Sequence, residues 1–308
     1  MWTIITSMMR MTLVVFTLCQ LCYCEKPKNI TLPELPPALV LHGYVGTGDR
    51  FRVAVGKTAI NSGILADDST LLVKNALVIL YENGVIKDTL DYFSLAREYT
   101  SAIIAKAGMT YRITVQVPGF TSVEATAKAP SFVPTNWVVR TRGARVDQLG
   151  NSQDDITFSF PDPAAEKNYY LAELSTYQFG LTPNTFCVYT YDPSVDKHQG
   201  DLDPFETSYC IDSREFIFTD KLFNGQTKEL TISTAASNLK SYTVGDRTYR
   251  PYLKKYSLSQ EYFRYINDAL TLGVLKDNPF SRPYTIPGNV KNGYGLFTVY
   301  SAVTDTLP

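Results

Sequence analysis

Short segments in which apolar and polar residues alternate constrain the fold of this chain most. In segment 111–117 every second side chain is apolar, the pattern of a β-strand with one buried face. Asn83-Gly84 separates two such segments, and this pair is the strongest short hairpin signal because both residues tolerate a positive φ. The 21 tyrosines and 16 phenylalanines suit a pleated, half-buried surface. The sequence therefore predicts an all-β protein.

The first part of the predicted fold consists of about seven short strands. They cover residues 38–45, 51–55, 75–81, 85–90, 99–105, 111–117 and 122–128. Seven short strands with turn residues between them are typical of an immunoglobulin-like β-sandwich. Pro130 and Pro134 mark its end, so we predict this first domain at residues 38–130.

The remainder, residues 131–308, is predicted as a larger mainly-β domain with one covering helix. Its expected strands are 137–141, 155–160, 168–177, 185–191, 214–219, 229–233, 247–256 and 295–303. The helix is expected near 258–272, where apolar residues recur at helical spacing. Ser257 with Gln260 resembles a capping box, and Gly273 suits a left-handed helix end. Such a helix has one apolar face that needs a sheet to cover.

The start of the chain indicates export and a lipid anchor. Arg10 precedes an uncharged, mostly apolar run, 11–23, which ends at Cys24. A transmembrane helix needs ~20 apolar residues, so this run is too short, and it suits a signal peptide that ends at a lipid-attachment cysteine. Tyr23 is bulkier than the residue usual before such a cysteine. The alternative is an ordinary signal peptide cut nearby, with Cys24 as a spare thiol.

We accordingly predict a lipoprotein signal peptide at residues 1–23 and an extended, Pro-rich linker at 24–37. Cys19 and Cys22 would leave with the signal peptide, and Cys24 would take the lipid. Two cysteines, Cys187 and Cys210, then remain. In an oxidising compartment they are candidates for a disulfide bond, and the alternative is two buried free thiols.

An acidic segment between these two cysteines is the candidate metal site. Carboxylates at this density could hold Ca²⁺, but their spacing does not match an EF-hand and most acidic loops are simply solvated. The prediction is therefore no metal and no cofactor, with a calcium site kept as the minor alternative. The candidate ligands are Asp192, Asp196, Asp201 and Asp203.

Other candidate chemistry is sparse. The 29 basic and 30 acidic residues form no basic stripe, so nothing favours nucleic-acid binding. Asp154 and Asp155 could contribute to a carboxylate site of a hydrolase only if two carboxylates lay a few ångströms apart with shifted pKa values. Trp137, Tyr169 and Tyr170 could stack on a sugar or contact a protein, although core packing is the more common role for each.

Several segments together resemble the domain of unknown function 4249 family, described as outer-membrane lipoproteins of Bacteroidota. Cys24 with its Glu-Lys and Pro-broken linker comes first, followed by the strand at 39–45. The other matching segments are 75–84, 108–115, 160–174, 218–227, 256–270 and 278–301. The resemblance covers nearly the whole chain after Cys24, and Tyr23 departs from the usual lipoprotein pattern.

The resemblance implies a lipid-anchored protein of the outer membrane that is commonly encoded near TonB-dependent transporters. It supplies no catalytic residues. We therefore expect a non-enzymatic accessory or binding component of a TonB-dependent transport system. Two alternatives stay open, namely a surface module that binds glycan or peptide by itself, and a hydrolase with an unrecognised carboxylate site.

Overall fold

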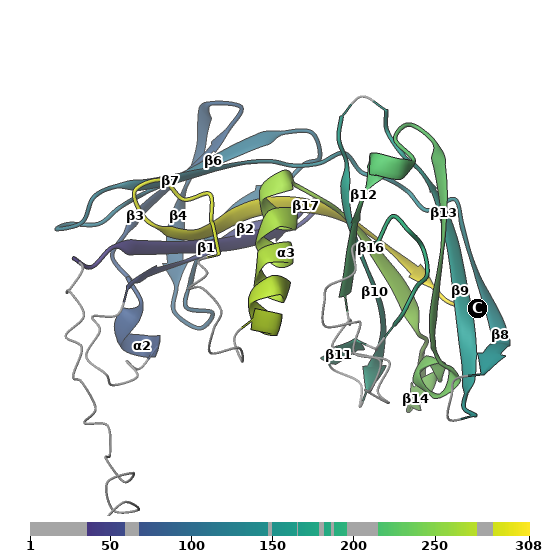
Figure 1. The fold of residues 1–308 in the computed structure, drawn as a ribbon. Helices are drawn as coiled ribbons and strands as arrows, with labels where there is room; N and C mark the ends of the chain where they lie inside the picture. The colour runs from purple at the N-terminus through teal and green to yellow at the C-terminus, as the bar shows by residue number, and fades with distance from the viewer. Residues whose placement is uncertain are drawn as a thin grey trace, which may run out of the picture. The chain divides into compact units, whose positions relative to one another are not determined.

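The structure is a computed structural model, and it describes residues 36–58, 68–146, 150–164, 166–178, 182–185, 188–195, 215–275 and 286–308. The described residues form a mainly β protein with one long helix (Figure 1), which confirms the predicted secondary-structure class.

Most of the described strands overlap the predicted segments, and β14 (Tyr242–Val244) is a strand that the sequence did not predict. The described strands are β1 (Leu39–Gly46), β2 (Arg50–Lys57), β3 (Leu77–Glu82), β4 (Val85–Phe93), β5 (Glu98–Ile104), β6 (Thr110–Gln116), β7 (Val123–Lys128), β8 (Trp137–Val146), β9 (Ser152–Pro161), β10 (Tyr169–Gln178), β11 (Thr182–Thr185), β12 (Glu215–Thr219), β13 (Thr227–Ala235), β14, β15 (Arg247–Tyr249), β16 (Tyr252–Leu258) and β17 (Tyr294–Thr306). The helices are α2 (Asp68–Leu71), α3 (Gln260–Leu275) and the 3₁₀ turns η2 (Asp220–Leu222) and η3 (Ala236–Leu239).

Most of the described strands belong to one mixed sheet. Its order is β11-β10-β16-β17-β1-β2-β5-β4-β3-β6-β7, and β12 pairs with β10 beside this path. A second sheet has the order β13-β9-β8, and β14 pairs with β15. The strand β4 pairs with β3 through its first part and with β5 through Asp91–Phe93, so the sheet changes partner within this strand.

The long strand β17 pairs with β1 through its first part and with β16 through its second part. It runs parallel to β1 from Tyr294 to Tyr300 and antiparallel to β16 from Ser301 to Thr306 (Figure 1). Phe297 and Val299 lie in the core formed by β1–β7, whereas Leu307, just after the strand, lies in the core between β10, β16 and the β13-β9-β8 sheet. The predicted domain limits stay a prediction, but this strand contributes to the packing on both sides of them.

The hairpin predicted at Asn83-Gly84 is confirmed. The two residues have φ values of 51° and 83°, the two positive values that a tight type I′ turn between β3 and β4 requires. The predicted strand at 247–256 is instead two strands, because Pro251 lacks a backbone N–H and lies between β15 and β16. The predicted strand at 185–191 contributes Thr185 to β11 and a single bridge from Tyr189 to Ser233.

The helix is confirmed, but both predicted ends are wrong. Ser257 lies within β16 and faces the buried side, whereas the Ser259 hydroxyl accepts a hydrogen bond from the Tyr262 N–H at 3.2 Å. Ser259 is therefore the residue that caps α3. At the other end, α3 continues through Gly273 to Leu275, because a single glycine in a helix interior costs only about 1 kcal/mol.

Three cores hold the described residues together. The first lies among β1–β7 and β17, and the second lies between the β10-β16-β17 end of the large sheet and β9 and β13. The third lies on the opposite face of β10 and β16, where Leu171, Ile217 and Leu258 pack against Phe263 of α3. We call this opposite face, which α3 partly covers, the outer face of the β10-β16-β17 sheet.

Candidate functional site

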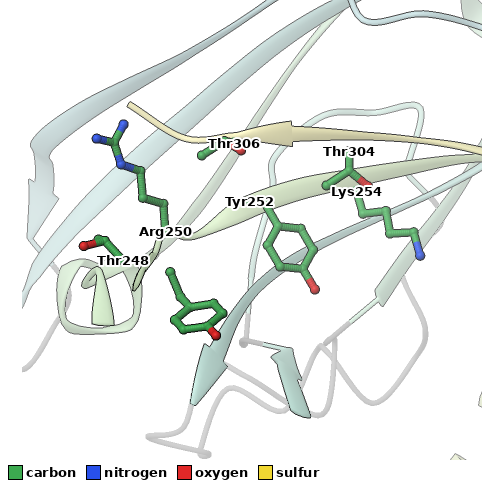
Figure 2. Close-up of a pocket in the computed structure, with 7 residues that line it drawn as sticks. Thr248, Arg250, Tyr252, Lys254, Thr304 and Thr306 are labelled. Carbon is green, nitrogen blue, oxygen red and sulfur yellow. The ribbon is translucent and has the colours of Figure 1, made fainter. Parts of the chain in front are cut away.

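An open hollow lies on the outer face of the β10-β16-β17 sheet. Its volume is about 360 Å³, within the range of ~300–1,000 Å³ typical of small-molecule sites. Its seven lining residues come from β15, the connection to β16, and the neighbouring strands β16 and β17 (Figure 2). They are Thr248, Tyr249, Arg250, Tyr252, Lys254, Thr304 and Thr306.

Strand register builds the floor of this hollow. Tyr252 pairs with Thr306 and Lys254 pairs with Thr304, so these four side chains share one face because side chains alternate along a strand. The same alternation continues to Tyr256 and Leu258, which α3 covers. The hollow is therefore the part of the outer face that lies beyond the residues packed against the helix.

Two of the lining residues are cationic. Figure 2 shows the Arg250 guanidinium and the Lys254 ammonium on opposite sides of the Tyr252 ring. Within the described part of the chain, no carboxylate oxygen lies within 4.0 Å of either cation. The Lys254 ammonium instead lies 4.7 Å from the centre of the Tyr256 ring, and that ring attracts the cation through its negative face.

One acidic residue lies beside Lys254 on the neighbouring strand β10. Glu173 is the cross-strand neighbour of Lys254, but its Oε1 atom accepts a hydrogen bond of 2.8 Å from the Tyr256 hydroxyl. None of the seven lining residues is acidic. The hollow thus combines positive charge, three threonine hydroxyls and two tyrosines, which suits an anionic or hydroxyl-rich ligand.

A series of aromatic rings extends from the hollow toward β1. Tyr256 and Tyr300 have ring centres 5.4 Å apart, Tyr300 and Tyr262 6.1 Å, and Tyr262 and Tyr44 5.5 Å. Tyr44 is 41% exposed, and burial of its remaining surface raises its pKa. His42 stacks beside Tyr44, with 6.4 Å between the ring centres, and burial lowers the pKa of this histidine.

On the inner face of the same strand, Lys255 is buried without a carboxylate partner within ion-pair distance among the described residues. Its ammonium donates a hydrogen bond of 2.8 Å to the Val133 carbonyl and lies 4.6 Å from the centre of the Phe160 ring. Burial lowers the pKa of Lys255 to about 7, and the charge of Asp305 opposes this effect. With 1% of its surface exposed, Lys255 is a core residue and not part of the hollow.

Most residues of the predicted site lie outside the described residues. This holds for the proposed lipid-attachment residue Cys24, for both cysteines of the predicted disulfide, Cys187 and Cys210, and for the acidic residues Asp196, Asp201 and Asp203.

Asp192 is the predicted calcium ligand that the structure does describe. Its two carboxylate oxygens lie 2.9 and 2.7 Å from the Lys228 ammonium, and the Ser194 N–H donates to Oδ1 at 2.9 Å. Burial alone would raise the pKa of Asp192, but the hydrogen bonds from Lys228 and Ser194 outweigh it and hold the pKa below its usual value. This carboxylate is therefore neutralised by a lysine.

The two carboxylates considered for a hydrolase do not face each other. Asp154 and Asp155 are neighbours on β9 and point to opposite faces, and each binds a different arginine. Asp154 contacts Arg140 at 2.7 Å and is almost fully buried, whereas Asp155 contacts Arg145 at 3.0 Å. The structure does not bring them together as an acid–base pair.

The three aromatic residues considered for ligand stacking have different surroundings. Trp137 is 42% exposed on β8, an edge strand of the small sheet. Tyr169 and Tyr170 are both buried and lie on opposite faces of β10. Trp137 is thus the member of this set that a ligand could reach.

Two further features are absent from the described ranges. No group of three or more His, Cys, Asp or Glu side chains there is arranged to hold a metal ion. No helix in these ranges is both long enough and apolar enough to span a bilayer.

Comparison with known proteins decides the family. The family model for a domain of unknown function (DUF4249) matches residues 25–306. The chain belongs to the DUF4249 family. The resemblance inferred from the sequence segments is thereby confirmed, and the described part of the DUF4249 fold in this chain is the mainly β arrangement above.

Comparisons with curated proteins and with solved structures do not extend this family assignment. No curated protein matches the sequence. One solved structure, of a protein from Corynebacterium diphtheriae described as membrane anchored, matches with 8% identity and a TM-score of 0.21. That match covers 72% of this chain and 54% of the other, so the DUF4249 chain spans about half the length of that protein. A TM-score this low supports no conclusion about fold or function.

Sequence reasoning missed the hollow, although a signal for it exists. The segment Arg250–Tyr256 places Tyr252, Lys254 and Tyr256 at every second position, which marks one face with amphipathic side chains. Their neighbours Thr304 and Thr306 follow the predicted last strand, which ended at residue 303. The lysine pair at 254 and 255 hid the pattern, because one lysine lies on each face and only packing reveals which is buried.

Proposed function

We propose that this DUF4249 protein is a lipid-anchored, non-enzymatic binding protein of the outer membrane that acts as an accessory component of a TonB-dependent transport system. The observation that carries the binding role is the open hollow with two cations and no acidic lining residue. The exported, lipid-anchored start at Cys24 supports the location, and the transporter partner is what the family resemblance implies.

The proposed role is non-enzymatic because the candidate carboxylates are engaged in ion pairs. Asp154, Asp155 and Asp192 each pair with a basic side chain. A general acid or base needs a group that faces the substrate with a suitably shifted pKa. These three carboxylates instead hold strands and loops together, which supports a binding protein over a hydrolase.

We also propose that the strands β1–β7 form an immunoglobulin-like sandwich. Constant-type immunoglobulin domains have strands A, B, E and D in one sheet and C, F and G in the other. The order β1-β2-β5-β4 followed by β3-β6-β7 corresponds to that arrangement if β1 to β7 are read as A to G. The change of partner within β4 would be the point where the two sheets meet.

The accessory role is tested by crosslinking in native membranes and purification through the full-length protein. We expect a TonB-dependent transporter to be recovered with the wild-type chain. The control is Cys24→Ser, which should lose lipid labelling and be released from the membrane, and should recover much less transporter. Repeated recovery of the wild-type chain without any transporter would overturn the accessory role.

A second candidate function is a surface module that captures a glycan or peptide by itself. The exposed threonine side chains and the half-buried Tyr249 around the hollow favour it, since a ligand could bind there without help from another chain. The two candidates differ in the crosslinking result. Ligand binding that persists while no transporter is ever recovered would indicate the independent module.

A further inference from the structure

We propose that the hollow between β15, β16 and β17 binds an acidic sugar, with its negative group held by Arg250 or Lys254. This inference rests on the binding role proposed above and names its ligand class. The ligand would be an oligosaccharide that carries carboxylate or sulfate groups and presents ring hydroxyls to the threonines.

The charges around the hollow favour an anion. Glu173, the cross-strand neighbour of Lys254, accepts the Tyr256 hydroxyl and forms no ion pair with Lys254 within 4.0 Å. Lys254 lies against an aromatic ring, and Arg250 is exposed beside the hollow. An anion beside either cation therefore meets a positive charge and displaces no described ion pair. Charge-assisted hydrogen bonds of this kind are about twice as strong as neutral ones.

The two cations are separated. Arg250 and Lys254 both line the hollow, and their charged groups lie on opposite sides of the Tyr252 ring (Figure 2). A single small anion would contact one cation and leave the other without a partner. A ligand with negative groups on successive units could reach both, which favours an oligosaccharide with repeated acidic groups over an isolated ion.

The hydroxyl and aromatic side chains of the hollow favour a sugar. Thr248, Thr304 and Thr306 are exposed, and each hydroxyl can both donate and accept a hydrogen bond, as sugar hydroxyls require. Tyr252 is only 8% exposed and forms the floor, while Tyr249 is half-buried beside it. A purely electrostatic anion site would need neither the hydroxyl rim nor the aromatic floor.

The test measures binding of the full-length lipoprotein in detergent by isothermal titration calorimetry. The probes are a galacturonic acid trimer, a neutral glucose trimer of similar size, and inorganic phosphate. We expect saturable binding of the acidic trimer and at least about tenfold weaker binding of the neutral one, since the neutral trimer lacks the carboxylates that accept charge-assisted hydrogen bonds. We expect phosphate to bind no more tightly than the neutral trimer.

The decisive variant is the double substitution Arg250→Gln with Lys254→Gln. It should weaken binding of the acidic trimer about 100-fold, because two charge-assisted contacts are lost. The matched control is Lys57→Gln with Lys221→Gln, which removes two exposed positive charges outside the hollow and should change the affinity less than about twofold. Both variants should melt at the wild-type temperature.

Three results would overturn the ligand class. They are equal binding of the acidic and neutral trimers, tight binding of phosphate alone, and unchanged acidic-trimer binding by the Arg250→Gln, Lys254→Gln variant. Recovery of a transporter by crosslinking together with any of these would refute the acidic-sugar inference and leave the accessory role standing. Acidic-trimer binding without a transporter would refute only the accessory role.

Discussion

At the scale of single residues, Lys255 shows how burial changes the chemistry of a side chain. Lys254 and Lys255 are neighbours, yet one lies at the hollow and the other in a core beside Phe160 and Tyr170. Burial lowers the pKa of Lys255 from 10.5 to about 7. Its charged form is therefore costly in the folded state, despite the hydrogen bond to the Val133 carbonyl.

Because burial lowers the pKa of Lys255, we expect the stability of the folded protein to depend on pH. Between about pH 7 and 10.5, the unfolded chain keeps the Lys255 proton that the folded protein has lost. The free energy of unfolding should therefore rise with pH across this window. Below pH 7 the folded protein bears the full cost of burying the charged Lys255 ammonium. Lys255→Met should remove this rise and increase the free energy of unfolding at pH 7 by about 1–3 kcal/mol, after the loss of the Val133 hydrogen bond is deducted.

Urea unfolding at pH 7 and at pH 9.5 checks this prediction. The control is Lys57→Met, because Lys57 is an exposed lysine and its replacement should leave the difference between the two pH values unchanged. The interpretation fails if Lys255→Met retains the wild-type pH dependence.

At the scale of elements, two of the segments that carry the family resemblance meet in the structure. The loop after β9 supplies Asp162, and the turn before β13 supplies Gly225. The Asp162 carboxylate accepts hydrogen bonds from the Tyr170 hydroxyl at 2.5 Å and from the Gly225 N–H at 2.8 Å. Burial raises the pKa of Asp162, although these hydrogen bonds act in the opposite direction. Asp162 therefore joins these two loops.

Removal of this carboxylate should destabilise the protein. Asp162→Ala leaves both the Tyr170 hydroxyl and the Gly225 N–H without their partner, and should cost about 2–4 kcal/mol. Tyr170→Phe removes only one of the two donors and should cost about 1–2 kcal/mol. Chemical denaturation of the two single variants and of the double variant measures the coupling. Additive effects would show that the two side chains do not interact as described.

The start of β17 lies in close contact with β1. Gly295 has a φ of 108°, and a Cβ atom there would lie 2.1 Å from the Leu41 carbonyl oxygen of β1. A side chain at this position would be strained and would also push β17 away from β1. This contact joins the segment 278–301 to the first strand, two more parts of the family resemblance.

Gly295→Ala should therefore cost clearly more than an ordinary glycine replacement. We expect a loss of at least about 3 kcal/mol in the free energy of unfolding, from backbone strain and displaced strand pairing together. The control is Gly119→Ala, where φ is 84° and a Cβ atom would meet open space, so that only about 1–2 kcal/mol of strain is expected. Equal losses in thermal or urea unfolding would contradict the close contact.

At the scale of the whole molecule, β17 has the largest structural role. Its first half completes the β1–β7 core, and its second half pairs with β16 and supplies Thr304 and Thr306 to the hollow. The hollow therefore forms only after the last strand of the chain has joined the sheet. One continuous strand therefore links two residues that line the hollow, Thr304 and Thr306, with the first strand of the described fold.

Most strands, the hairpin at Asn83-Gly84, the helix after β16 and the DUF4249 family could be predicted from the residues alone. These features are local or depend on the order of segments: a period of two reveals a strand, and a positive φ favours Asn and Gly. The other features depend on contacts between segments that are far apart in the sequence. Alternation places Lys254 and Lys255 on opposite faces but does not say which face is buried, and no local signal pairs β17 with β1. Packing between distant segments settled both, and with them the position of the hollow.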